Sequence, residues 1–211
     1  MYALDNPMGL VDPDGRVPLP PQNNQKPYNV RGNTLSKVAP QLAKIGGFAS
    51  GTTGTLTVSN VKSGGTVAQL SSGTYSATLT VNSADVQSTT TTESPVWVDK
   101  SKASPGAQQE WDRFSGAVDT HEGGHTAIMN GAAVTLDSAL PGLSATGTGA
   151  TAADATAAAN AALGANVQGA TNAAVAAADA TNVAHDAPPP TGTGHGATQG
   201  AVLDTSKDKK K

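Results

Sequence analysis

Two histidines four positions apart, with a glutamate between them, form the pattern in this chain that could do chemistry. They are His121 and His125 in the sequence HEGGH, and Glu122 follows the first histidine directly. On a helix, residues four positions apart lie on the same face, so both imidazoles can reach one metal ion. Glu122 is then placed to take a proton from a water molecule that the metal activates. The pattern predicts a metal site with its own general base.

A third protein ligand must come from elsewhere, because catalytic zinc sites hold three protein ligands and leave one position open. The chain has no cysteine, so the third ligand must be a histidine or a carboxylate. We favour His195, whose two neighbouring glycines let a loop approach the helix closely. The alternatives are His185, then a carboxylate such as Asp186 or Asp137. If it is not a ligand, His185 could orient one or stabilise an oxyanion. The competing interpretation is that these histidines are ordinary core or surface side chains.

The helix that must present the motif has clear ends. Ser104 is a good capping residue and Pro105 suits the first helical position, while the Pro141-Gly142 pair ends the run. Apolar side chains and both motif histidines recur at spacings of three and four, which predicts one buried face. Its members are Trp111, Phe114, Val118, His121, His125 and Ile128. The two glycines inside the motif each cost about 1 kcal/mol in a helix, so we expect another element or a substrate to approach them closely.

The other segments predict a small sheet and a second long helix. Residues 28–32 suggest a short strand, and residues 34–43 a helix with Thr34 as its cap. Residues 51–98 alternate in the manner of strands, with turns expected at 63–65 and 72–73. Residues 151–184 are rich in alanine and predict a long helix, which Pro188-Pro189-Pro190 would stop before a glycine-rich loop.

Composition bounds the class of protein. The chain has 211 residues, 3% aromatic residues and a net charge of −3, so it has no basic patch for nucleic acid. No stretch approaches the roughly 20 apolar residues of a membrane helix. The N-terminal residues lack the pattern of a signal peptide. We expect residues 1–27 to be a leader, residues 28–203 a single domain, and residues 204–211 a solvated charged tail.

The leader carries a resemblance of its own. Residues 2–16, YALDNPMGLVDPDGR, resemble the end of the RHS repeat-associated core, where a tyrosine-containing strand meets an NP turn and a DPxG element closes the core. The resemblance implies that this chain is the C-terminal piece of an RHS-type polymorphic toxin. It further implies a parent RHS cage, delivery into a target cell by a secretion system, and a cognate immunity protein in the producer.

A second resemblance covers residues 28–203. The segments YNVRG, WDRF, HEGGH and TGHGATQG, in this order, resemble a family proposed to be bacterial zinc proteases, the DUF922 family. The resemblance implies that His121, His125 and His195 bind Zn²⁺ and that Glu122 is the base. The family often has a Tyr-Asp pair before its closing motif. Here His185-Asp186 stands instead, so no tyrosine-based role carries over.

Together these observations predict an α+β, zincin-like metallopeptidase. We expect a small, mainly antiparallel sheet, an HExxH helix against it, and a long alanine-rich C-terminal helix that brings the third ligand. The expected reaction is hydrolysis of amide bonds in a protein, a peptide or the peptides of peptidoglycan. The alternative is a non-catalytic RHS tip module that binds a receptor or partner through a degenerate metal site.

Overall fold

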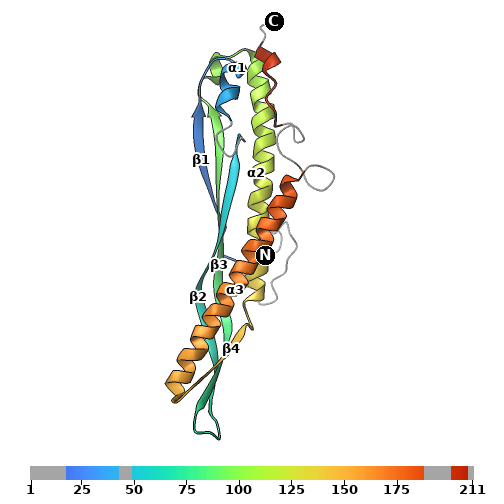
Figure 1. Cartoon of the computed structure of the whole chain (residues 1–211). Coiled ribbons are helices and arrows are strands. Elements are labelled where there is room, and N and C mark those ends of the chain that lie inside the picture. The colour runs from blue at the N-terminus through green and yellow to red at the C-terminus, as the bar shows by residue number, and fades with distance from the viewer. Residues whose placement is uncertain (1–17, 43–48, 188–200, 209–211) are drawn as a thin grey trace, which may run out of the picture. The chain divides into compact units, whose positions relative to one another are not determined.

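A computed structural model describes residues 18–42, 49–187 and 201–208 of the chain. It is an α+β protein with one small mixed sheet and two long helices (Figure 1). The leader up to residue 17, which carries the RHS resemblance, and His195 lie outside the described residues.

The sheet is built on two long strands. They are β2 (Gly51–Gln69) and β3 (Tyr75–Trp97), joined by a turn in which the Gly73 N–H donates to the Leu70 carbonyl. The strand order is β1-β3-β2, and β4 also pairs with β3. β1 (Gln22–Val30) runs parallel to the end of β3, whereas β4 (Ser144–Gly149) runs antiparallel to its start. The sheet is therefore mixed, because the β1–β3 pairing is parallel whereas the β3–β4 pairing is antiparallel.

Two 35-residue helices accompany the sheet. α2 (Pro105–Ala139) carries the HEGGH motif, and α3 (Ala152–Asp186) is the alanine-rich helix predicted at 151–184. Four shorter helices are also present in the described part of the chain: α1 (Leu35–Val38), η1 (Ala39–Gln41), η2 (Lys100–Lys102) and η4 (Thr205–Asp208). Among the described residues, no helix is long and apolar enough to cross a membrane.

The chain divides into two compact units, to which β2, β3, α2 and α3 each contribute residues. We call the first the histidine unit, because it holds every described histidine: Gln22–Thr55, Thr89–Asn130 and Ala176–Lys211. We call the second the hairpin unit, because it holds the β2–β3 turn: Met1–Pro21, Leu56–Ser88 and Gly131–Val175.

The histidine unit has an aromatic core. Trp111 lies between Trp97 and Phe114, with ring centroids 5.4 and 5.5 Å away. Small and branched apolar side chains from β1, α1 and α2 complete this cluster: Val30, Leu35, Val38, Leu42, Ala107 and Val118. Burying these groups is the main stabilisation that holds the first half of α2 in place.

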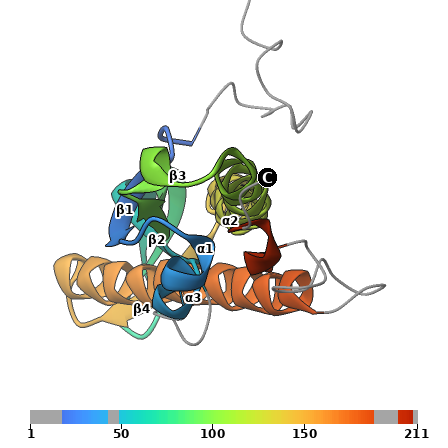
Figure 2. The ribbon, with the colours of Figure 1, turned by 90° about the horizontal axis from the view of Figure 1, so that it is seen from above.

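The C-terminal η4 packs onto this unit beside α1 and the start of α2 (Figure 2). The Asp208 carboxylate accepts hydrogen bonds from the backbone N–H groups of Leu35 and Ser36, at 2.5 and 2.8 Å. Thr34 occupies the cap position predicted for it but makes no side-chain capping bond. Asp208 thus supplies the cap of α1, while residues 205–207 of the predicted charged tail are exposed.

The hairpin unit is held by aliphatic and alanine side chains. Val81, Val86, Leu136, Leu140 and Leu163 are buried in one cluster. In a second, smaller cluster, Ala77 of β3 packs against Ala155 and Ala159 of α3. Small residues let the elements of this unit approach closely, which explains its low aromatic content.

Three expectations from the sequence need correction. Residues 63–65 do not form a turn but lie inside β2, and a Cβ at Gly65 would overlap the Thr78 backbone, so this glycine serves close strand approach. β1 begins at Gln22, before the predicted start at Tyr28. On α2, Met129 is buried and Ile128 only half-buried, so the apolar face shifts by one residue beyond His125.

Candidate metal centre

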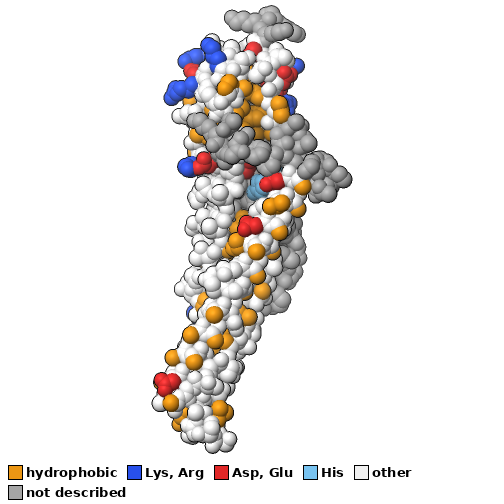
Figure 3. Space-filling model, in the orientation of Figure 1, with side chains coloured by type: hydrophobic (Ala, Val, Ile, Leu, Met, Phe, Trp, Pro, Cys, Tyr) orange, Lys and Arg blue, Asp and Glu red, His pale blue; other side chains and the backbone are white. Residues whose placement is uncertain are grey.

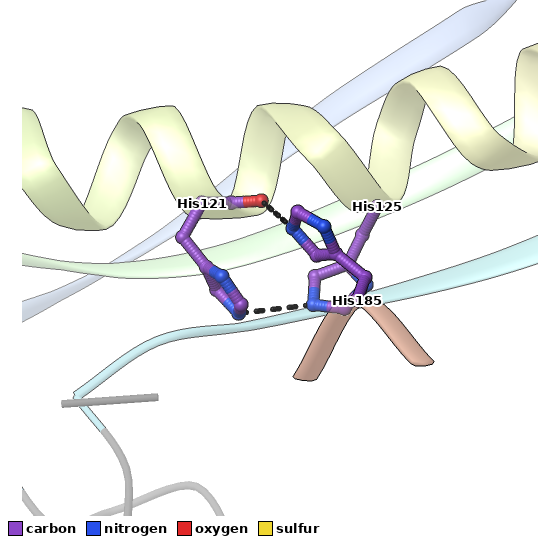
Figure 4. A group of neighbouring side chains, drawn as sticks. All are labelled: His121, His125 and His185. Atoms are coloured by element: carbon purple, nitrogen blue, oxygen red, sulfur yellow. Dashed lines mark hydrogen bonds between the residues drawn. The ribbon is translucent and has the colours of Figure 1, made fainter. Parts of the chain in front are cut away.

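The two motif histidines occupy the buried face of α2, as their spacing predicts. His121 and His125 are 6% and 7% exposed, whereas most of the other buried side chains of α2 are apolar. Their Nε2 atoms lie 3.1 Å apart, and the rings meet edge to face (Figure 4). Ser104 starts this helix by accepting a hydrogen bond from the Ala107 N–H at 3.3 Å, which confirms the predicted cap.

His185, from the last turn of α3, completes a group of three histidines. Its ring stacks on His121 with a centroid distance of 4.8 Å and an interplanar angle of 15°. Its Nε2 lies 3.3 Å from the His121 carbonyl oxygen (Figure 4). One ligand atom from each of His121, His125 and His185 lies within 4.8 Å of the others, so these residues can hold a metal ion.

Gly124 explains how α3 can reach α2 at this point. A Cβ at position 124 would overlap the His185 ring. The second glycine of the motif therefore serves close approach of another element, as its cost in a helix suggested. Gly123 is exposed. Apart from its chain neighbours and the backbone of its own helix, no described atom lies within 4 Å of a Cβ built there. The prediction of close approach holds for one glycine of the pair.

Asp186 brings a carboxylate to the same place. Its Oδ1 lies 3.3 Å from Nε2 of His121 and 3.0 Å from Nε2 of His125. Together with the 3.1 Å between the two nitrogens, these distances form a nearly equilateral triangle. Neighbouring ligand atoms around a tetrahedral zinc ion, with bonds of about 2.1 Å, lie about 3.4 Å apart. The three atoms thus have nearly the spacing of one face of such a site.

Asn182 is a site residue that the sequence did not reveal. Its Oδ1 lies 2.9 Å from Nδ1 of His125. When this Nδ1–H donates to Asn182, Nε2 keeps its lone pair for a metal, which is the usual role of a second hydrogen bond to a ligating histidine. Asn182 lies three and four positions before His185 and Asp186 on α3, and this spacing from the two predicted alternatives is the signal that could have found it.

Glu122 is buried and turned toward the sheet. It is 4% exposed, and its Oε2 accepts a hydrogen bond from the Thr52 hydroxyl of β2 at 2.7 Å. Thr52 in turn lies 2.9 Å from the hydroxyl of Thr92 on β3. Glu122 does not belong to the group of three histidines. It lies beside the predicted ligands on α2 but is held by the strands.

The donor set of this group fits zinc. Imidazole nitrogens and a carboxylate oxygen are among the ligands that zinc prefers, and no thiolate is present. The Asp186 side chain is 33% exposed, and histidine surface is visible beside acidic side chains in the space-filling view (Figure 3). Part of this site is therefore exposed to solvent.

Two of the predicted alternatives are not part of this group. His195, the favoured third ligand, lies outside the described residues. Asp137 is half-buried in the hairpin unit and is not a member of the metal-binding group found among the described residues.

Comparison with known proteins gives a family match. Residues 25–196 match the model of a family described as bacterial protein of unknown function, DUF922. The matched segment includes both the HEGGH motif and the end of α3. No curated protein and no solved structure shows significant similarity to the chain.

Proposed function

Because the chain belongs to the DUF922 family and places His121, His125 and His185 together beside a buried glutamate, we propose that it is a zinc-dependent peptidase. The observation that carries this proposal is the meeting of the HEGGH segment of α2 with the last turn of α3. Nothing in the packing of an ordinary helix requires three imidazoles and the Asp186 carboxylate at one point, since buried polar groups cost free energy unless they are paired.

The ion would be held by Nε2 of His121 and His125, with the third ligand from the end of α3. We assign that ligand to Asp186, because its Oδ1 is close to both nitrogens, whereas Nε2 of His185 lies against a backbone carbonyl. When bound, zinc supplies a Lewis acid that polarises a carbonyl group and lowers the pKa of water at the site. Asn182 fixes the orientation of His125, and His185 packs on His121.

Glu122 is the proposed general base. Its carboxylate would take a proton from the attacking water and deliver it to the leaving nitrogen of the amide, the two proton transfers that peptide hydrolysis needs. Substrates of this reaction class include proteins and the peptides of peptidoglycan, because both contain amide bonds. Zincin-like ancestry is part of this proposal and rests on the HExxH pattern.

We further propose that the peptidase is the C-terminal effector of an RHS-type polymorphic toxin. The support is the resemblance of residues 2–16 to the end of an RHS core. The proposed partners are the RHS cage of a parent polypeptide and a cognate immunity protein, and the proposed route is delivery by a secretion system into a target cell.

The metal assignment is tested by measuring zinc per chain in the wild type and in single variants. We expect about one zinc per wild-type chain, retention in Glu122→Gln, and loss in His121→Ala and in Asp186→Ala. His185→Ala and His195→Ala are measured in parallel, and zinc loss in either one, with retention in Asp186→Ala, would move the third ligand to that histidine. No zinc in the reconstituted wild type would favour the non-catalytic binding module.

Activity is tested on fluorescein-labelled casein and on purified peptidoglycan. The zinc-loaded wild type should cleave one of them, and Glu122→Gln should lose turnover while it keeps its zinc, because only the proton acceptor is removed. An active Glu122→Gln protein would refute the role of this residue. A zinc-loaded wild type that cleaves neither substrate would argue against the peptidase proposal and for the binding module.

A further inference from the structure

The buried Glu122 carboxylate is anchored at one oxygen by the sheet. An ionised carboxylate in a site that is 4% exposed must accept hydrogen bonds, because an unpaired buried charge is very costly. The Thr52 hydroxyl provides one at Oε2, across 70 positions of the sequence. This bond leaves Oε1 as the second oxygen of the group. The two oxygens of Glu122 are therefore not equivalent.

The Glu122 carboxylate fixes the direction of both hydrogen bonds in this group. A carboxylate can only accept, so the Thr52 hydroxyl proton points to Glu122. The 2.9 Å contact between the two threonine hydroxyls must then be donated by Thr92 to the Thr52 oxygen. Donation by Thr92 polarises the Thr52 hydroxyl and strengthens its bond to Glu122. The order Thr92, Thr52, Glu122 is thus a directed chain from β3 through β2 to α2.

The choice of threonine at position 92 is informative because the site is deeply buried. Thr90 and Thr92 are 1% and 7% exposed on the inward face of β3, where valine would have the same shape without a hydroxyl to satisfy. The Thr90 hydroxyl donates to Asn23 Oδ1 at 2.9 Å, and that of Thr92 lies against Thr52. Each of these two hydroxyl groups thus has a hydrogen-bond partner, and the partner of Thr92 is itself hydrogen-bonded to Glu122.

The backbone around Thr52 is built for close approach to α2. Gly54 lies two residues further along β2, so it has the same facing as Thr52. A Cβ at Gly54 would overlap the Met129 side chain, one helical turn after His125. The missing side chain lets this part of β2 lie close to the motif helix, and the Thr52 hydroxyl reaches Glu122 as a result.

From this arrangement we propose that Thr52, supported by Thr92, is the positioning residue of Glu122. It pins Oε2 and so reserves Oε1 for proton transfer in the reaction, a role that rests on the proposed peptidase function. Misplacement of a reacting group by about 1 Å can cost 100-fold in rate. Loss of the Thr52 hydroxyl should therefore act on turnover, and not on metal binding.

The test compares Thr52→Val, which keeps the shape and removes the hydroxyl, with Thr52→Ser, which keeps the hydroxyl. In Thr52→Val we expect kcat to fall about 10- to 100-fold with KM and zinc content unchanged. Thr52→Ser should recover kcat to within about threefold of wild type, and Thr92→Val should lose an intermediate factor. Thr53→Val, on the exposed face of β2, is the matched control and should keep wild-type kcat.

A second measurement does not depend on activity. In chelator-treated protein, the unfolding midpoints of Thr52→Val, Glu122→Met and the double variant form a cycle. Because the two side chains form one hydrogen bond, we expect the double variant to lose less than the sum of the single losses. If the wild type cleaves no substrate, the peptidase proposal fails and this cycle still decides whether Thr52 holds Glu122.

Two results would overturn the positioning role. One is a Thr52→Val protein with kcat within about twofold of wild type, since a tenfold effect is the least expected from loss of base alignment. The other is strict additivity of the unfolding midpoints, which would mean that the Thr52 hydroxyl and the Glu122 carboxylate do not interact.

Discussion

His125 depends on a residue 57 positions away for its orientation. Asn182 Oδ1 lies 2.9 Å from Nδ1 of His125, and an amide oxygen at this point favours the tautomer with the proton on Nδ1, which would leave the lone pair of Nε2 for a metal. Nε2 of His125 lies 3.0 Å from Oδ1 of Asp186. A side chain of α3 thus contributes to the orientation of a predicted ligand on α2.

We expect Asn182→Ala to weaken zinc binding by about 10- to 100-fold, the usual cost of removing such a partner. Asn182→Asp keeps an acceptor oxygen and should retain most of the affinity. Competition against a chromophoric zinc chelator measures both, with Asn172→Ala on the exposed side of α3 as the control. Equal zinc affinities in Asn182→Ala and the wild type would show that Asn182 does not orient the ligand.

At the scale of elements, the site exists because the last turn of α3 lies against α2 at Gly124. Helix propensity alone would favour alanine here by about 1 kcal/mol. A Cβ at this position would overlap the His185 ring, so the glycine is retained against propensity. Gly123, its exposed neighbour, carries no such restriction among the described residues.

The two glycines therefore give opposite predictions for the same substitution. Gly123→Ala should stabilise the protein by up to about 1 kcal/mol and leave zinc affinity unchanged. Gly124→Ala should displace His185 and the turn that carries Asp186, with lower zinc affinity and no gain in the thermal midpoint. Thermal unfolding and zinc titration of both variants test this, and zinc binding by Gly124→Ala equal to that of Gly123→Ala would contradict it.

At the scale of the whole molecule, the aromatic side chains mark the unit that holds the site. Both tryptophans of the chain, Trp97 and Trp111, lie in the core of the histidine unit. Tyr28 packs against the same core, and its single hydroxyl proton is shared between the carbonyl oxygens of Ala49 and Leu42, at 2.6 and 3.2 Å. Tryptophan fluorescence therefore reports the unfolding of this unit specifically.

Burial, with the nearby Glu93 carboxylate, raises the pKa of Tyr28 to about 12 from its ordinary value of 10.0. The folded state thus holds the phenol proton more tightly than the unfolded state. Its contribution to stability is complete below pH 10 and is lost as the pH rises toward 12. We expect the urea midpoint, followed by tryptophan fluorescence, to fall over this range.

Tyr28→Phe separates this effect from the titration of lysines. The variant loses the shared hydrogen bond of the hydroxyl and should be less stable at neutral pH, but its midpoint should fall less between pH 10 and 12 than that of the wild type. Parallel alkaline decreases in the two proteins would show that Tyr28 does not contribute.

Features with a local cause could be predicted from the sequence alone. The buried face of α2 around His121 and His125, the cap at Ser104, the helix of α3 and the turn near Gly73 all follow from spacing and from residue preferences within a few positions. Strand lengths could not be predicted, because Gly64 and Gly65 signal a turn in isolation and lie inside β2 in the folded chain, where Gly65 serves close strand approach.

Only the tertiary structure decided which side chains meet the motif. Thr52 reaches Glu122 across 70 positions, and His185 reaches the His121 backbone across 64. No local pattern encodes such pairings, because they depend on how closely β2 and α3 pack against α2, and hence on the missing side chains at Gly54 and Gly124. The sequence by itself determined the chemistry that α2 offers. Packing determined the residues that orient and complete it, because contact between distant segments is a property of the folded core.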